Sequence, residues 1–139
     1  MATEGPSDVH VATLLIVDDD ARIRTMLRRV FEHASYQVLD AGDGRQALSV
    51  LESHPVDLLI TDIIMPDTEG IELITRVRGR WADLPIIAMS GGGWIDPAPY
   101  LELARTLGAD RIMSKPLNLE LLLNACAEIL KTPPSPKTP

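Results

Sequence analysis

Residue types that bind metal ions and phosphate stand directly after four short apolar runs of this 139-residue chain. The first run ends in the acidic triplet Asp18–Asp20, and the third ends in Asp62. The fourth run ends in Ser90, and the fifth is followed by Lys115. Clustered carboxylates repel one another unless a cation lies among them, and a hard divalent ion such as Mg²⁺ prefers oxygen ligands. If these residues meet, they predict a magnesium site.

Magnesium in such a cluster indicates an anionic substrate, above all phosphate. A carboxylate can itself be the nucleophile and form an aspartyl phosphate. The ammonium of Lys115 and the hydroxyl of Ser90 would then contact phosphoryl oxygens. The amides of Gly91–Gly93 can approach closely because glycine has no side chain. These residues together predict phosphoryl chemistry.

Five short apolar runs, alternating with segments of helical period, would have to position these groups. We predict strands at Val11–Val17, Gln37–Ala41, Asp57–Asp62, Pro85–Ser90 and Arg111–Ser114. In the segment after the first strand, one helix face is predicted to carry Ile23, Met26, Leu27, Val30 and Phe31.

Three side chains are predicted to begin helices as N-caps. They are Asp20, Asp43 (with Gln46 three residues later, a variant of the capping box) and Asn118. A helix is also predicted around Ile71–Val77 and another at Tyr100–Leu107. The elements therefore follow a strand–helix alternation repeated five times.

Continuously apolar strands such as LLIV and IIAM require cover on both faces, which is typical of a parallel sheet between helix layers. Because crossovers between parallel strands are right-handed, we predict a doubly wound α/β fold: a five-stranded parallel sheet in a three-layer sandwich. In such folds the ligand crevice lies at the carboxyl ends of the strands. The polar residues listed first should therefore meet at one edge of the sheet.

Composition excludes several classes of protein. Apolar residues make up 45% of the chain and charged residues 24%, which favours one soluble globular domain. Twenty acidic against thirteen basic residues, a net charge of −7, argues against direct binding of nucleic acid. The single Cys126 cannot form an internal disulfide, and neither a signal peptide nor an apolar run of about 20 residues is found. We therefore expect a cytoplasmic protein that does not enter the membrane.

The expected organisation is a short N-terminal extension (residues 1–10), one domain (residues 11–131) and a flexible proline-rich tail (residues 132–139). Cys126 is predicted to lie in the core, on the buried face of the last helix.

The ordered segments LLIVDDD, LLITDIIMPDTEG, IIAMSGGG and IMSKPL resemble the receiver domain of two-component response regulators, over roughly Thr13 to Leu130. The resemblance implies a flavodoxin-like (βα)5 fold and a stand-alone, chemotaxis-regulator-like receiver. By this resemblance Asp62 is the phosphorylated aspartate. Asp18, Asp19 and Asp62, with the backbone carbonyl of Ile64, would hold Mg²⁺.

The resemblance also assigns the remaining site residues. Ser90 corresponds to the switch hydroxyl, and Lys115 to the receiver lysine, with a cis bond expected to Pro116. Ile112 stands where receivers often place an aromatic residue, so the usual swing of a Tyr or Phe is excluded. The segment between Ser90 and Lys115 looks longer than usual, and we hypothesise that Trp94 or Tyr100 moves instead.

The implied function is that of a signalling switch and not an enzyme beyond its self-catalysed phosphotransfer and dephosphorylation. It would accept a phosphoryl group on Asp62 from a histidine kinase or histidine phosphotransfer protein, and so change its affinity for a downstream protein. A monomer and a phosphorylation-dependent dimer both agree with the sequence.

Two alternatives stay open at this point. One is a small Mg²⁺-dependent phosphatase of the haloacid dehalogenase type, in which Asp18 and Asp20 act as nucleophile and acid. The other is a degenerate receiver that binds its partners without phosphorylation. The aspartate that carries the phosphoryl group distinguishes the receiver from the phosphatase.

Overall fold

A computed structural model describes residues 11–63, 69–90 and 98–130, in which strands and helices alternate. In chain order they are β1 (Thr13–Val17), α1 (Ala21–His33), β2 (Gln37–Ala41), α2 (Gly44–Ser53), β3 (Leu58–Asp62), α3 (Glu69–Arg80), β4 (Ile86–Ser90), α4 (Ala98–Leu107), β5 (Arg111–Ser114) and α5 (Leu119–Leu130). All strand pairs are parallel, in the order β2-β1-β3-β4-β5. The predicted doubly wound α/β fold is confirmed.

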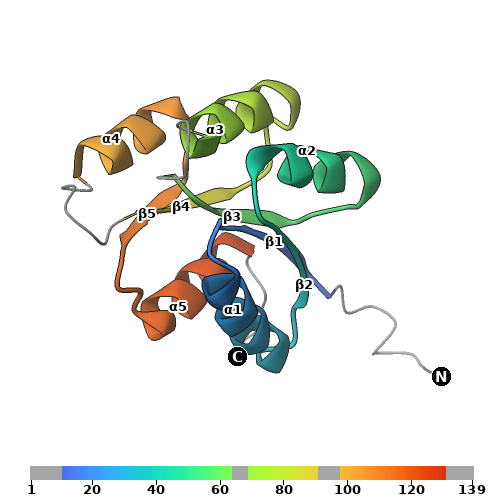
Figure 1. The fold of residues 1–139 in the computed structure, drawn as a ribbon. Helices are drawn as coiled ribbons and strands as arrows, with labels where there is room; N and C mark the ends of the chain where they lie inside the picture. Colours follow the sequence, from blue (N-terminus) through green and yellow to red (C-terminus); the bar gives the residue numbers. More distant parts are fainter. Residues whose placement is uncertain (1–10, 64–68, 91–97, 131–139) are drawn as a thin grey trace.

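The sheet is the middle of three layers, with α2, α3 and α4 on one face and α1 and α5 on the other (Figure 1). Successive residues of β1 serve the two cores in turn: Leu15 and Val17 pack with α2–α4, and Leu14 and Ile16 pack with α1 and α5. Every residue of β1, β3 and β4 is buried. The polar side chains on these strands are Thr13 at the start of β1, and Thr61, Asp62 and Ser90 toward the carboxyl ends of β3 and β4, where the site lies.

The predicted N-caps are confirmed. The carboxylate of Asp20 accepts the backbone N–H of Arg22 at 2.9 Å and begins α1. At α2 Asp43 accepts the N–H of Gln46 at 2.8 Å, which is the first half of a capping box. The amide oxygen of Gln46 accepts the N–H of Gly42 in return, at 3.0 Å. Asn118 accepts the N–H of Leu121 at 3.1 Å at the start of α5.

The prediction that Met26 shares the buried face of α1 is wrong, since Met26 is 38% exposed. The buried stripe of α1 is set by Leu27 and Phe31, one turn apart and both fully buried. Met26 lies about 100° around the helix from Leu27, on the side that faces solvent. Cys126 is fully buried as predicted, and burial raises the pKa of its thiol to about 12.

Several element boundaries also differ from the sequence prediction. β1 begins at Thr13, β3 at Leu58 and β4 at Ile86, one or two residues later than predicted, whereas α4 begins at Ala98 and not Tyr100. Val11 is 47% exposed and stands outside the sheet. In the part of the chain that the structure describes, no helix has the length and apolar character needed to cross a membrane.

At the edge of the sheet opposite the strand carboxyl ends, Arg78 joins the chain before β4 to the chain before β5. Its guanidinium donates to the carbonyls of Ala82 (2.7 Å), Leu84 (2.9 Å) and Gly108 (2.7 Å). Gly108 has φ +120°, and a Cβ there would come within 2.8 Å of Arg78 Nε. Glycine is therefore required at position 108 by both its backbone angle and its neighbour.

We predict that Gly108→Ala lowers the free energy of unfolding by roughly 1–2 kcal/mol, from the left-handed backbone alone. Urea denaturation measures the change. The matched control is Gly79→Ala on α3, where a Cβ meets no atom within 4 Å. It should raise stability by up to about 1 kcal/mol, because alanine favours a helix over glycine. Equal effects from the two variants would contradict the strain at Gly108.

Candidate active site

The carboxyl ends of the strands bring distant residues into contact. Asp18 directly follows β1, Asp62 ends β3 and Lys115 directly follows β5. The ammonium of Lys115 donates to Asp18 Oδ2 at 3.0 Å and to Asp62 Oδ2 at 3.3 Å. One cation thus bridges two carboxylates that are 97 and 53 residues away from it in the chain.

Asp19 completes an acidic cluster with these two aspartates. One carboxylate oxygen from each of Asp18, Asp19 and Asp62 lies within 4.8 Å of the others. The side chains of Asp18 and Asp62 are 1% and 7% exposed, whereas Asp19 is exposed to solvent. Three converging carboxylates supply the hard oxygen donors that fit a magnesium ion.

Lys115 keeps its proton in this site. Burial disfavours the charged ammonium, but the charges of Asp62 and Asp18 and their hydrogen bonds outweigh that effect, so the pKa of Lys115 lies above its ordinary value. A lysine that stays charged can offset the negative charge of a phosphoryl group. The bond between Lys115 and Pro116 is cis, as the resemblance implied.

Ser90 ends β4 at the same edge and is paired in register with Ser114 of β5. Its side chain is fully buried, and its Oγ has no hydrogen-bond partner among the described residues. An unsatisfied buried hydroxyl costs about 1–3 kcal/mol. This hydroxyl is therefore available to an incoming oxygen, while the Ser90 carbonyl accepts the backbone N–H of Lys115 at 2.8 Å.

Asp20 is directed away from the acidic cluster. Besides capping α1, it pairs with the exposed guanidinium of Arg22 at 3.3 Å. Two hydrogen bonds from Arg22 lower the pKa of Asp20: the larger effect comes from the Arg22 side chain and the smaller from its backbone N–H. Asp20 is therefore a helix cap that stays ionised. The phosphatase alternative needs Asp20 as a proton donor, so this arrangement does not favour it.

The remaining predicted site residues differ in what the structure says of them. Ile112 lies in β5, half-buried, and packs against the core on the α2–α4 face. Ile64, Gly91–Gly93 and Trp94 lie outside the described residues. Arg24 was missed by the sequence reasoning: its guanidinium donates to the backbone carbonyl of Asp18 at 2.7 Å. The only signal was a basic residue six positions after Asp18.

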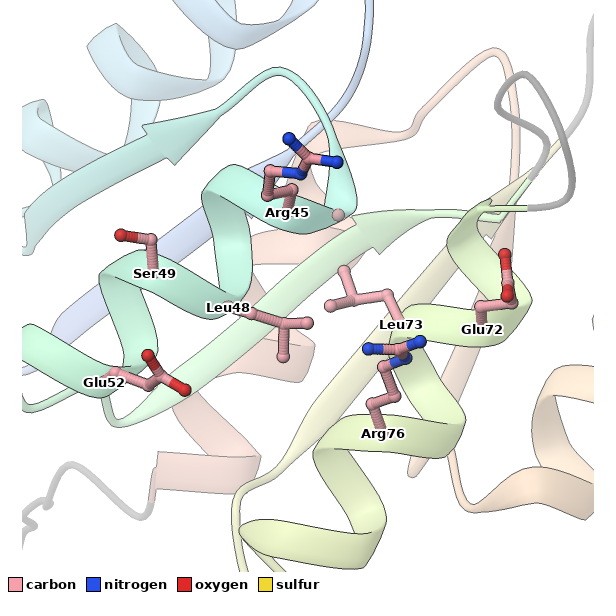
Figure 2. Close-up of a pocket in the computed structure, with 8 residues that line it drawn as sticks. Arg45, Leu48, Ser49, Glu52, Glu72, Leu73 and Arg76 are labelled. Carbon is pink, nitrogen blue, oxygen red and sulfur yellow. The ribbon is translucent and has the colours of Figure 1, made fainter.

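A pocket of about 430 Å³ between α2 and α3 is separate from these residues (Figure 2). Leu48 and Leu73 lie in it, and charged side chains surround them, as the full lining shows: Gly44, Arg45, Leu48, Ser49, Glu52, Glu72, Leu73 and Arg76. None of the acidic cluster contributes to it, so the chemistry is assigned to the strand ends.

The parallel sheet, with an acidic cluster at its carboxyl edge, places the protein in the flavodoxin-like α/β class. A family model described as the response regulator receiver domain matches residues 14–127, and the chain belongs to this family. Receiver domains of this family belong to two-component systems. The match supports the receiver interpretation and not the phosphatase alternative.

Known proteins agree with this assignment. The chain is 42% identical over 106 residues to the response regulator GtcR of Aneurinibacillus migulanus, covering 76% of this chain and 42% of the relative. It is 35% identical over 118 residues to the response regulator MprA of Mycobacterium tuberculosis, covering 85% of this chain and 50% of the relative. The chain thus spans half or less of the length of these curated relatives.

Solved structures give the same result. The chemotaxis response regulator CheY4 of Vibrio cholerae has 30% identity and a TM-score of 0.76, with 86% of this chain and 99% of that chain covered. A putative response regulator from Chloroflexus aurantiacus has 32% identity and a TM-score of 0.78, with 88% and 100% covered.

Gly70 of α3 packs directly against the backbone that carries Asp62. A Cβ at Gly70 would come within 2.4 Å of both the Asp62 carbonyl oxygen and Ile63 Cα. Backbone atoms cannot rotate away, so we predict that Gly70→Ala displaces Asp62 and lowers stability by about 1–3 kcal/mol. The contact between Asp62 and Lys115 should loosen with it.

Urea denaturation gives the stability of this variant, and the amide NMR signals of Asp62 and Lys115 report the displacement. Gly79→Ala, on the same helix, is again the control and should leave both signals in place. Unchanged signals in Gly70→Ala would show that α3 shifts as a body and that Asp62 stays where it is.

Proposed function

We propose that this chain is a phosphorylated receiver: Asp62 accepts a phosphoryl group from the phosphohistidine of a histidine kinase or phosphotransfer protein. The phosphorylated form then binds another protein with altered affinity. The observation that carries this proposal is the ammonium of Lys115 lying between Asp18 and Asp62, at 3.0 and 3.3 Å. A cation in that place is suited to phosphoryl oxygens entering next to Asp62.

In the transfer, a carboxylate oxygen of Asp62 attacks phosphorus while the bond from phosphorus to the donor's imidazole nitrogen breaks. The electrons of that bond stay on the imidazole, which is the leaving group. The Lys115 ammonium and the Ser90 hydroxyl donate to phosphoryl oxygens as charge develops on them. The phosphoryl group carries nearly two negative charges and replaces the single charge of the Asp62 carboxylate, beside the carboxylates of Asp18 and Asp19.

Magnesium fits this proposal through the donor set of Asp18, Asp19 and Asp62, to which the predicted backbone carbonyl of Ile64 would be added. When bound, Mg²⁺ supplies positive charge that offsets the phosphoryl group and the carboxylates. Asp18 has a further role of its own, because its Oδ1 accepts the N–H of Asp20 at 2.9 Å and so orients the chain entering α1.

The first test is intact mass after incubation with acetyl phosphate and Mg²⁺. We predict that the parent chain gains one phosphoryl group and that Asp62→Asn gains none, because the amide oxygen is a poor nucleophile. Asp18→Asn is the comparison, since Asp18 also contacts Lys115. Asp18→Asn should lower the fraction of chains that gain a phosphoryl group, but labelling should still occur because Asp62 is intact.

Two results would overturn the proposal. A folded parent chain that gains no phosphoryl group in the presence of Mg²⁺ would indicate the degenerate receiver. Labelling that persists in Asp62→Asn and is lost in Asp18→Asn would indicate a different phosphorylated aspartate.

The switching part of the proposal involves the Ser90 hydroxyl and an aromatic residue, Trp94 or Tyr100, because position 112 carries an isoleucine. We predict that the emission of Trp94 changes on phosphorylation. The second tryptophan, Trp81, follows α3 and stacks with Arg80, whose guanidinium lies 4.8 Å from the ring centroid. The measurement is therefore made in a Trp81→Phe background, with Asp62→Asn added as the control. Constant emission in the fully phosphorylated protein would remove Trp94 from the switch.

A further inference from the structure

Arg24 of α1 contacts the backbone of the acidic cluster, on the side of β2. Its Nη1 donates to the carbonyl oxygen of Asp18 at 2.7 Å, and its Nε lies 3.7 Å from Asp40 Oδ2 on β2. The side chain of Arg24 is 22% exposed and that of Asp40 is 33% exposed. The guanidinium is thus enclosed between two strands and a helix, with a distinct partner on each side.

Local geometry explains why the arginine reaches this carbonyl. Arg24 lies in the first turn of α1, and side chains of a helix tilt toward its N-terminus, here toward the end of β1. The N–H of Asp18 donates to the Ala41 carbonyl at 3.2 Å, beyond the last paired residues of β1 and β2. The carbonyl of Asp18 therefore lies past the ladder, and Arg24 supplies its donor.

Gly42 leaves room for the guanidinium. A Cβ at Gly42 would stand 3.2 Å from Arg24 Nη1 and 3.6 Å from its Cζ. The N–H of Gly42 is held by Gln46 of the α2 capping box, which fixes this wall of the enclosure. The position of Arg24 is thus set by β2 and α2 as well as by its own helix.

The bond to the Asp18 carbonyl controls the direction of Asp19. The carbonyl of Asp18 and the N–H of Asp19 belong to one planar peptide unit, so anchoring the oxygen fixes how the chain leaves β1. The Asp18 carboxylate is held separately, by the N–H of Asp20 at 2.9 Å and by Lys115 at 3.0 Å. Asp19 is exposed, so its carboxylate depends on the backbone for its place in the cluster.

We propose that Arg24 is a positioning residue of the metal site, which holds the Asp18–Asp19 peptide so that the carboxylates converge. Asp40 supports this arrangement, because it pairs with the Nε side of the guanidinium while Nη1 holds the Asp18 carbonyl. The inference rests on the proposed function, because it takes the cluster of Asp18, Asp19 and Asp62 to be a magnesium site.

Arg28 provides a matched control, one turn further along α1. Its Nη1 donates to the Val38 carbonyl at 3.0 Å, and its Nη2 donates to Asp40 Oδ1 at 3.3 Å. Arg28 therefore makes the same kinds of contact, a backbone carbonyl and the same carboxylate, together with an exposed pair to Glu32 at 3.3 Å, and among the described contacts it has no bond to Asp18. Loss of either arginine should cost comparable stability, and only Arg24 should affect the metal.

The experiment titrates Mg²⁺ into the full chain and follows amide NMR shifts of the acidic cluster in the parent, Arg24→Met, Arg24→Lys and Arg28→Met. We expect Arg24→Met to bind Mg²⁺ roughly tenfold more weakly than the parent. Arg28→Met should bind it as the parent does. Arg24→Lys should fall between, since lysine can donate to the Asp18 carbonyl but lacks the fork that reaches Asp40 at the same time.

Urea denaturation without Mg²⁺ separates a positioning role from a structural one. If Arg24→Met and Arg28→Met lose similar stability and bind Mg²⁺ equally well, the inference is overturned. If Arg24→Met does not fold, Arg24→Lys decides: weaker Mg²⁺ binding than in Arg28→Met supports the inference, and equal binding overturns it.

The outcomes for the inference and for the proposed function are distinct. A parent chain that binds Mg²⁺ but gains no phosphoryl group on Asp62 would overturn the function, while the arginine comparison still supports or overturns the inference. A parent chain that does not bind Mg²⁺ would overturn both the inference and the magnesium part of the function.

Discussion

The contact of one ammonium with two buried carboxylates is the interaction on which the site depends. Lys115 meets Asp18 and Asp62 only because β5 and β3 end at the same edge of the sheet as β1. Taking these charges out of water costs several kcal/mol per ion, and attraction offsets this only when the geometry is good. The register of a fully buried parallel sheet supplies that geometry, because a slip by one residue would turn each strand over.

The polar residues at the two edges of the sheet have different roles. At the amino end, Arg78 joins two loops through four backbone carbonyls, and Gly108 makes room for it. These contacts satisfy polar groups and stabilise the fold. At the carboxyl end, Ser90 keeps a buried hydroxyl without a partner among the described residues, and the carboxylates of Asp18 and Asp62 both accept from Lys115. Stabilising contacts gather at one edge, and groups ready for a ligand gather at the other.

The sequence predicted the parts of the structure that leave a local chemical pattern. The apolar runs predicted the strands. Because parallel strands all end at one edge, the polar residues at the ends of these runs predicted that Asp18, Asp62, Ser90 and Lys115 lie at the same edge of the sheet. The N-caps were predictable because the side-chain acceptor and the backbone donor lie two or three residues apart. Only the exact starts of the strands and of α4 were misplaced.

Contacts between a side chain and a distant backbone carbonyl leave no such pattern. The partners of Arg24 and Arg78 are carbonyl oxygens, which every residue carries, so the residue type at the acceptor position says nothing. Met26 failed for a related reason: helical period places it at the margin of the apolar stripe of α1, and the packing of Leu27 and Phe31 decides which side of that margin is buried. Such choices are made by tertiary contacts.

The buried charges at the strand ends are not explained by folding. Replacing a buried ion pair with apolar side chains of similar volume is often neutral or stabilising, so a sheet built only for stability has no need of Asp18 and Asp62 in positions 1% and 7% exposed. The same holds for Ser90, whose methylene would pack as well without its hydroxyl. For Asp62, Ser90 and Lys115, a charged group that enters between them supplies a physical reason to be polar. The phosphoryl group proposed for Asp62 would engage these three residues at once: the ammonium and the hydroxyl would gain acceptors, and the Asp62 carboxylate would form the new bond.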